Sequence, residues 1–102
     1  CENHEGVFRT ATWTIDICSE LAFVLPHEMG HAWERANLSD ASRNTYMEAY
    51  GFDFWQAGTT VRNEQAIEDV AFVIQLVILG GGRSGRPNID QAFDLLVALA
   101  AI

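Results

Sequence analysis

The pentapeptide HEMGH, residues 27–31, constrains this chain more than any other feature. An α-helix turns by about 100° per residue, so side chains four positions apart lie above one another on one face. His27 and His31 would therefore point the same way, with Glu28 one step round the helix. Two imidazoles placed like this can bind one metal ion, and the adjacent carboxylate can hold a water on that ion. Chance would produce the motif in such a chain with odds of roughly one in a hundred. The alternative is that both histidines are ordinary helix residues bonded to backbone or water.

The helix that carries the motif is expected over residues 19–36, with Ser19 as its N-cap. Pro26 interrupts this pattern, because a proline inside a helix removes one backbone hydrogen bond. The helix therefore either kinks at Pro26 or begins there. Both options leave residues 27–33 helical, so the spacing of the two histidines does not depend on the choice.

Length and charge exclude several classes of protein. A chain of 102 residues with 49% hydrophobic residues is expected to form one domain, residues 1–102, with its own core. Six Lys and Arg against fourteen Asp and Glu give a net charge of −8, which argues against nucleic acid and anionic membranes as partners. The longest apolar run, VAFVIQLVIL at 70–79, is interrupted by Gln75 and is shorter than the ~18 residues of a membrane span. It is typical of a buried helix.

The two cysteines bear on where the protein works. Cys1 and Cys18 allow one disulfide, which fits an exported protein, whereas two free thiols fit the cytosol. We expect a secreted or cell-envelope protein slightly more than a cytoplasmic one. The sequence begins at Cys1 rather than Met, which suggests a processed product or a trimmed chain. A thiolate on zinc is disfavoured, because neither cysteine has the short paired spacing of a cysteine metal site.

A β-strand is predicted over residues 10–18. Trp13, Ile15 and Ile17 alternate with polar residues there, as in a strand buried on one face. If it lies at a sheet edge, it could hold an extended peptide by strand addition. The alternative is that it only packs its Trp13 face on the following helix.

The rest of the chain is predicted to be mostly helical, so the fold class is α+β. The aromatic residues of YGFDFW, 50–55, favour a place in the core over the wall of a cleft. Three further helices are expected. One covers 38–50, with Ser39 or Asp40 as its N-cap and Gly51 at its end, and a largely apolar one covers 63–79. The last starts in a capping box formed by Asn88 and Gln91, and its inner face carries Ile89, Ala92, Phe93, Leu96 and Val97.

A catalytic zinc usually has three protein ligands, so the motif requires one more. A metzincin would have glycine at 34 and histidine at 37, where this chain has Glu34 and Asn37. No histidine follows His31, and His4 lies near the N-terminus, where it is disfavoured. A downstream carboxylate remains.

Glu64 and Glu68 are the strongest carboxylate candidates. They are four apart in NEQAIEDVAF, so a helix would place both on one face beside apolar residues. One would bind the metal and the other would hydrogen-bond a ligand histidine. Alternatively, both lie at an exposed helix N-terminus, where acidic residues are favourable. Asp69 is rotated off this stripe and is the weaker candidate.

With these residues in place, the sequence from about 10 to 79 resembles a compact gluzincin-type zincin, in which HExxH on one helix is followed by a glutamate on a second. It is similar to catalytic domains of the lethal-factor type and the ImmA/IrrE type, and to small uncharacterised bacterial HExxH proteins. The resemblance implies a zincin-like zinc metallopeptidase that acts on peptides or proteins. It implies that Glu28 is the general base and that His27, His31 and Glu64 are the zinc ligands. It also implies that Glu68 does not bind the zinc but hydrogen-bonds a ligand histidine. Pro26 and Ile67 depart from the usual pattern.

Enzymes of this kind often place a tyrosine beside the reaction oxyanion, and this chain has no clear match. Tyr46, Tyr50 and Arg62 are the candidates. Two other functions also fit the sequence. One is a non-catalytic domain that zinc stabilises, and the other is a peptide-binding module without a metal. Because the chain is acidic, we expect neutral or basic peptides to be better tolerated than acidic ones.

Overall fold

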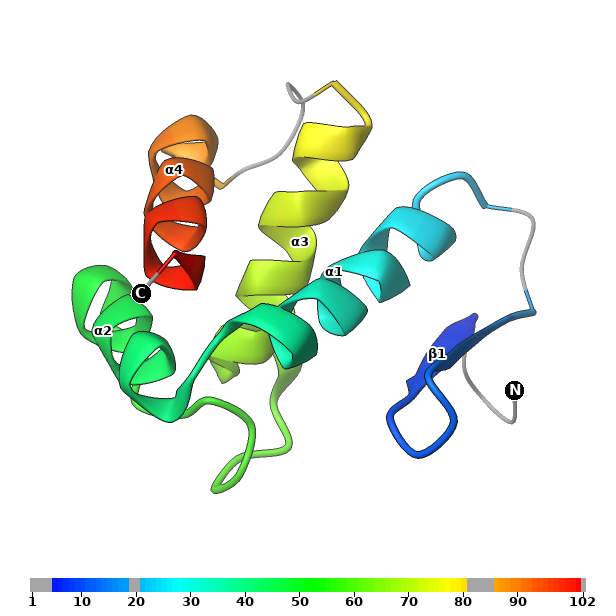
Figure 1. The fold of residues 1–102 in the computed structure, drawn as a ribbon, viewed down its shortest axis with the longest axis horizontal. Coiled ribbons are helices and arrows are strands. Elements are labelled where there is room, and N and C mark those ends of the chain that lie inside the picture. Colours follow the sequence, from blue (N-terminus) through cyan, green and yellow to red (C-terminus); the bar gives the residue numbers. More distant parts are fainter. Residues whose placement is uncertain (1–4, 19–20, 81–85, 102) are drawn as a thin grey trace.

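The computed structural model describes residues 5–18, 21–80 and 86–101. Within them the protein has the mixed α+β composition expected, mostly helical with strands near its N-terminus. The strands β1 (Gly6–Arg9) and β2 (Thr14–Ile17) form an antiparallel hairpin. This hairpin packs against the first helix, beside the N-terminal half of that helix in Figure 1.

The helices are arranged around a central one, α3 (Ala66–Ile78). α1 (Val24–Asn37) crosses α3, α4 (Ile89–Ala100) packs beside α3, and α2 (Asp40–Tyr50) packs against α4 (Figure 1). A short 3₁₀ helix, η1 (Arg62–Glu64), leads into α3. Among the described residues, no helix has the length and apolar character that crossing a membrane requires.

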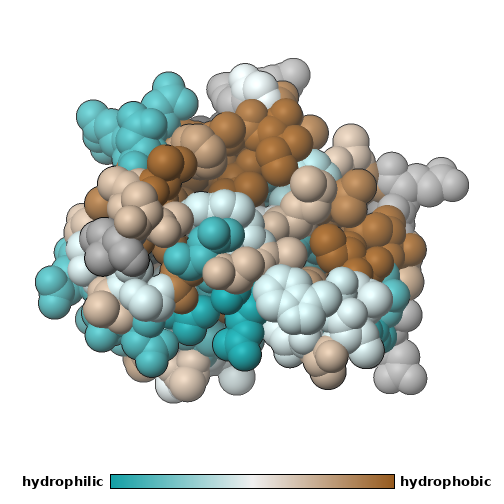
Figure 2. All heavy atoms as spheres, viewed as in Figure 1, coloured by the Kyte–Doolittle hydropathy of each residue, from teal (hydrophilic) through white to brown (hydrophobic). Residues whose placement is uncertain are grey.

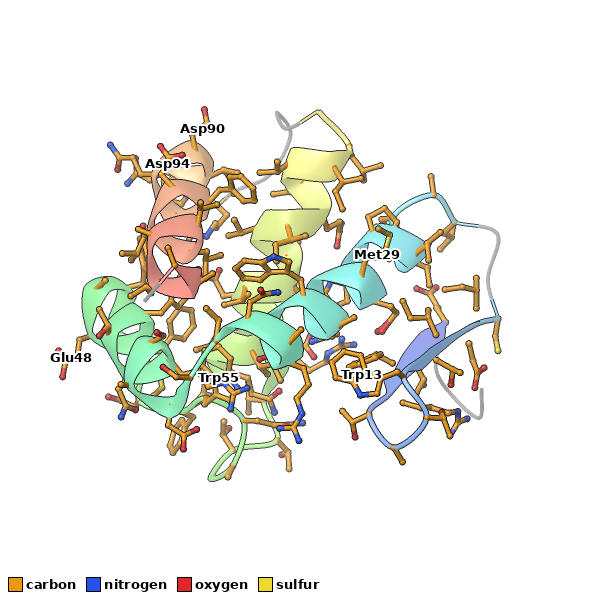
Figure 3. All side chains as sticks on the ribbon, in the orientation of Figure 1. Trp13, Met29, Glu48, Trp55, Asp90 and Asp94 are labelled. Atoms are coloured by element: carbon orange, nitrogen blue, oxygen red, sulfur yellow. The ribbon has the colours of Figure 1, made fainter. Side chains whose placement is uncertain are left out.

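The predicted strand over 10–18 is correct only for β2. Thr10 to Trp13 form the turn of the hairpin, and Trp13 has a positive φ of 53°. The alternation of apolar residues continued through this turn, so the pattern could not show where the strand begins. Trp13 also does not pack on the helix as a buried face: it is 58% exposed and contacts Phe8 edge to face, with ring centroids 5.5 Å apart. Figure 3 shows it at the hairpin.

The start of α1 answers the question about Pro26. The helix begins at Val24, later than the predicted residue 19, and Pro26 lies in its first turn. Amides in a first turn have no partner within the helix, so the missing N–H of proline costs nothing there. Ser19, the expected cap, lies outside the described residues.

The second helix forms as predicted. The Ser39 side chain accepts a hydrogen bond from Ser42 N at 3.1 Å, which is an N-cap. At the other end Gly51 has a φ of +74° and donates its N–H to Met47 O. Glycine suits this left-handed position because it has no Cβ.

The third helix begins later than predicted. Gln65 is extended and forms an isolated bridge with Phe54. In consequence Ala66 N donates to Phe54 O at 2.9 Å and Ile67 N donates to Trp55 O at 3.0 Å. These bonds stabilise a start of the α-helix at Ala66. The expected α-helix at 63–65 is therefore wrong: residues 63 and 64 belong to the 3₁₀ helix η1, and Gln65 is extended.

The fourth helix forms without its predicted capping box. Asn88 is the N-cap residue but has a φ of 58°, and its side chain makes no capping hydrogen bond. Ala92 and Leu96 are buried as expected, whereas Val97 is 49% exposed. Asp90 and Asp94 project from the outer side of this helix (Figure 3).

The core lies between α2, α3 and α4. Its fully buried side chains include Tyr46, Val70, Val73 and Leu96. Most of the YGFDFW aromatics pack against this core, which favours the core interpretation of that segment: Tyr50, Phe52 and Trp55. Apolar side chains also remain on the surface, and Figure 2 shows them gathered toward the end of α3 and the start of α1.

A glycine allows α1 and α3 to come close. A Cβ on Gly30 would lie 2.8 Å from Ala71 Cα, closer than packed atoms approach. The two backbones therefore touch within the HEMGH segment itself. This contact fixes which face of α1 is turned toward α3.

Candidate metal centre

Two histidines of α1 and one glutamate of α3 converge at this crossing. One ligand atom from each of His27, His31 and Glu68 lies within 4.8 Å of the others. His27 Nε2 is 3.0 Å from Glu68 Oε2, and His31 Nε2 is 3.4 Å from Glu68 Oε1. All three side chains are partly buried, at 14–20% exposure. These residues form the cluster that could hold a metal.

Gln75 orients the first of the two imidazoles. Its Oε1 lies 2.9 Å from His27 Nδ1, two turns along α3 from Glu68. An amide oxygen only accepts, so Nδ1 carries the proton and a neutral His27 turns the lone pair of Nε2 toward Glu68. A lone pair and a carboxylate oxygen 3.0 Å apart repel each other unless a cation lies between them. A metal ion or a proton satisfies this geometry.

The electrostatics of the metal-free cluster favour the proton. Burial lowers the pKa of His27, but the hydrogen bond and the charge of Glu68, with the Gln75 bond, outweigh burial and raise it above 6.5. Burial raises the pKa of Glu68, but hydrogen bonds from His27, His31 and Arg62 hold it well below its usual range. Without metal, the pair therefore favours an imidazolium beside a carboxylate.

Zinc affinity should consequently fall as the pH is lowered. A metal requires neutral His27, and because its pKa is raised, protons begin to compete above pH 6.5 rather than below it. Below that pKa each pH unit costs about tenfold in affinity for this one proton. We expect the dissociation constant for zinc to rise between about pH 8 and pH 6 in titration calorimetry, with a slope that steepens toward about tenfold per pH unit as the pH falls. An affinity that stays constant over this range would contradict His27 as a metal ligand.

Glu28 lies beside the cluster with one oxygen unsatisfied. It is 7% exposed, and among the described residues its Oε2 has no hydrogen-bond partner. A buried carboxylate oxygen without a partner is costly, so it calls for a water or other donor. Glu28 also lines the two larger hollows next to the cluster. It is placed to accept a proton there.

Glu64 does not join this group. It lies on η1 and is exposed, so the prediction that Glu64 and Glu68 share a helical face is wrong. The bridge at Gln65 ends the 3₁₀ helix before α3 starts. Because no continuous helix joins Glu64 to Glu68, their spacing of four does not place them on one face. Glu68 therefore occupies the position that the resemblance gave to Glu64. Asp69 is not part of the cluster, because Arg86 binds both of its oxygens, at 3.0 and 2.8 Å.

Neither tyrosine candidate lines a hollow beside the cluster. Tyr46 is fully buried and its hydroxyl donates to Asp69 at 2.5 Å, and burial together with Asp69 raises its pKa far above the usual range. Tyr50 packs under Arg86, with the guanidinium 4.8 Å from the ring centroid. Arg62 is different, because its Nη2 donates to Glu68 Oε2 at 3.0 Å.

Three hollows border the cluster. Their volumes are about 710, 410 and 290 Å³, and each is lined by at least one of His27, His31 and Glu68. The largest has an apolar wall of Phe23, Val24 and Phe72, and the second is bounded by β1. A Cβ on Gly6 would lie 2.6 Å from Val24 and 3.1 Å from Glu28, so this glycine lets β1 approach α1 over the catalytic candidate.

The structure thus brings together four of the predicted site residues, His27, His31, Glu28 and Glu68, with the oxyanion candidate Arg62, and it adds Gln75. In the sequence, Gln75 appeared only as the polar interruption of an apolar run. Its position seven residues after Glu68, about two helical turns, is the signal that could have identified it. His4 and Cys1 lie outside the described residues, so the Cys1–Cys18 disulfide remains a prediction. Comparison with protein-family models, curated proteins and solved structures finds no match to this chain.

Proposed function

We propose that this protein is a zinc-dependent peptidase of the gluzincin-like type, with His27, His31 and Glu68 as zinc ligands. One observation carries the proposal: three side chains that could hold a metal converge beside a buried glutamate whose Oε2 has no hydrogen-bond partner among the described residues. A stabilising zinc site alone would have no use for this fourth group, Glu28, which lines two open hollows.

Zinc is the metal that these donors suit. Two imidazole nitrogens and one carboxylate, with a fourth position left for water, are typical of catalytic zinc. Gln75 supports this choice, because histidines that bind metal usually donate their other N–H to a fixed acceptor. The bound ion would polarise a substrate carbonyl and lower the pKa of water from about 16 to about 7.

Glu28 would act as the general base and then as the general acid. It would accept the proton of the attacking water and pass it to the leaving amine. Its burial next to Val24 and Gly6 keeps this carboxylate away from bulk water. His27 and His31 would remain neutral throughout, with Gln75 holding the ring of His27 in place.

The outer edge of β1 is suited to hold an extended peptide. Cys18 N donates to Glu5 O at 2.8 Å, so these two residues form a hydrogen-bonded pair of the hairpin. With the register of the hairpin, the backbone groups of Val7 and Arg9 then also hydrogen-bond β2. Antiparallel pairs alternate, so the backbone groups of Gly6 and Phe8 face the other way. This edge borders the second hollow, where a peptide added as a third strand would pass the cluster. The peptide-binding role considered for the strand at 10–18 would thus fall to β1 instead of β2.

Peptide hydrolysis that depends on zinc would test the proposal. The purified protein loaded with zinc should cleave a mixture of neutral and basic peptides, stop when a chelator removes the metal, and recover when zinc is added back. Cleavage sites are read by mass spectrometry. Zinc binding without turnover would favour a non-catalytic zinc domain. Peptide binding that is indifferent to chelator would favour a metal-free binding module.

A further inference from the structure

Arg62 stands directly beside the metal-binding cluster. It is the first residue of η1, and its Nη2 shares Glu68 Oε2 with His27 Nε2, each 3.0 Å from that oxygen. The guanidinium is therefore within reach of a substrate group bound at the cluster. Its side chain is 72% exposed and borders all three hollows.

The charges around the hollows make this arginine distinctive. Within the described chain, Arg62 is the one Lys or Arg side chain among their lining residues, which include the acidic Glu5, Glu28, Glu34 and Asp69. A guanidinium has five N–H donors, and the contact with Glu68 uses one of them. The remaining donors can serve an anion that develops in the cleft.

We propose that Arg62 is a catalytic residue that stabilises the oxyanion formed from the substrate carbonyl, in the role that a tyrosine often has. This assignment rests on the proposed peptidase function. As the water oxygen bonds to the carbonyl carbon, its proton passes to Glu28 and the π electrons of the carbonyl move onto the substrate oxygen. When the carbonyl re-forms, the C–N bond breaks and the proton from Glu28 passes to the leaving amine. Arg62 would donate to the oxygen while it carries the negative charge.

A purely structural role does not explain this position. Ion pairs of exposed side chains contribute little to stability, and Arg62 is mostly in solvent. Glu68 already has two histidine partners, so it does not require the arginine to be satisfied. The arginine instead places a permanent positive charge among the residues that line the three hollows.

Replacing Arg62 by Gln in the zinc-loaded protein tests the assignment. We expect kcat to fall by about 10²-fold, with KM and zinc affinity unchanged within about threefold. Arg62→Lys keeps the positive charge but loses the planar guanidinium with its several N–H donors, so its kcat should fall by about tenfold. The second readout is binding of a phosphinic analogue of the best-cleaved peptide, since its tetrahedral anion resembles the oxyanion. Arg62→Gln should weaken that binding by a factor similar to the loss in kcat, by titration calorimetry.

Arg35→Gln is the matched control, because Arg35 is exposed near the end of α1 and lines none of these hollows. It should behave like the wild type. Equal phosphinate affinity in the wild type and Arg62→Gln would overturn the assignment. So would a loss of zinc affinity large enough to explain the fall in kcat, because Arg62 would then only position Glu68. If the zinc-loaded wild type cleaves no peptide, the proposed function fails and takes the assignment with it.

Discussion

Glu28→Gln is expected to abolish peptide hydrolysis while zinc stays bound. Glutamine has nearly the same shape as glutamate but does not accept the proton of the attacking water. General acid–base catalysis contributes about 10²–10⁴-fold to the rate, and Glu28 would serve in both directions, so we expect kcat to fall by at least about 10³-fold. Initial rates give kcat, and elemental mass spectrometry on the same sample gives the zinc content.

Glu48→Gln makes the same chemical change at a neutral site. Glu48 is exposed on α2 and points away from the rest of the molecule in Figure 3. It should retain the activity of the wild type. A zinc-loaded Glu28→Gln protein that still cleaves at the wild-type rate would contradict the role of Glu28 as general base.

The second large effect concerns the carboxylate ligand. Glu68→Ala should weaken zinc binding by more than the roughly 10–100-fold that is typical when the hydrogen-bond partner of a ligand is lost. Glu64→Ala removes the same group from an exposed position four residues earlier, so the zinc affinity should not change. Competition against a fluorescent chelator measures both dissociation constants.

The pair of variants separates two arrangements of the site. If Glu64→Ala loses zinc and Glu68→Ala retains it, the assignment that the family resemblance implied is right and the geometry described above is not. If neither variant affects zinc, the metal is held elsewhere. Both proteins should fold, because each side chain is partly or fully exposed and neither belongs to the hydrophobic core.

Local sequence was sufficient for the parts of the fold that depend on neighbouring residues. The histidines four apart on α1 and the Ser39 cap of α2 follow from helix geometry and capping alone. The buried character of α3 was also readable, because its apolar residues run almost without interruption. Each of these features is decided within a few residues of chain.

The third member of the cluster depended on a contact between distant segments. Phe54 and Gln65 pair across the loop that separates them, and this bridge determines that α3 begins at Ala66. A spacing argument assumes a continuous helix from Glu64 to Glu68, so it could not choose between them. The strand β1 was missed for a similar reason, since Gly6–Arg9 is short and acquires its structure from pairing with β2.

The zinc content of the purified wild type decides whether this cluster binds one zinc ion, as we propose. Elemental mass spectrometry after exposure to zinc and removal of excess metal should find about one zinc per chain. We expect this zinc to be lost in Glu68→Ala and retained in Glu64→Ala. No bound zinc after reconstitution, or iron in its place, would contradict it.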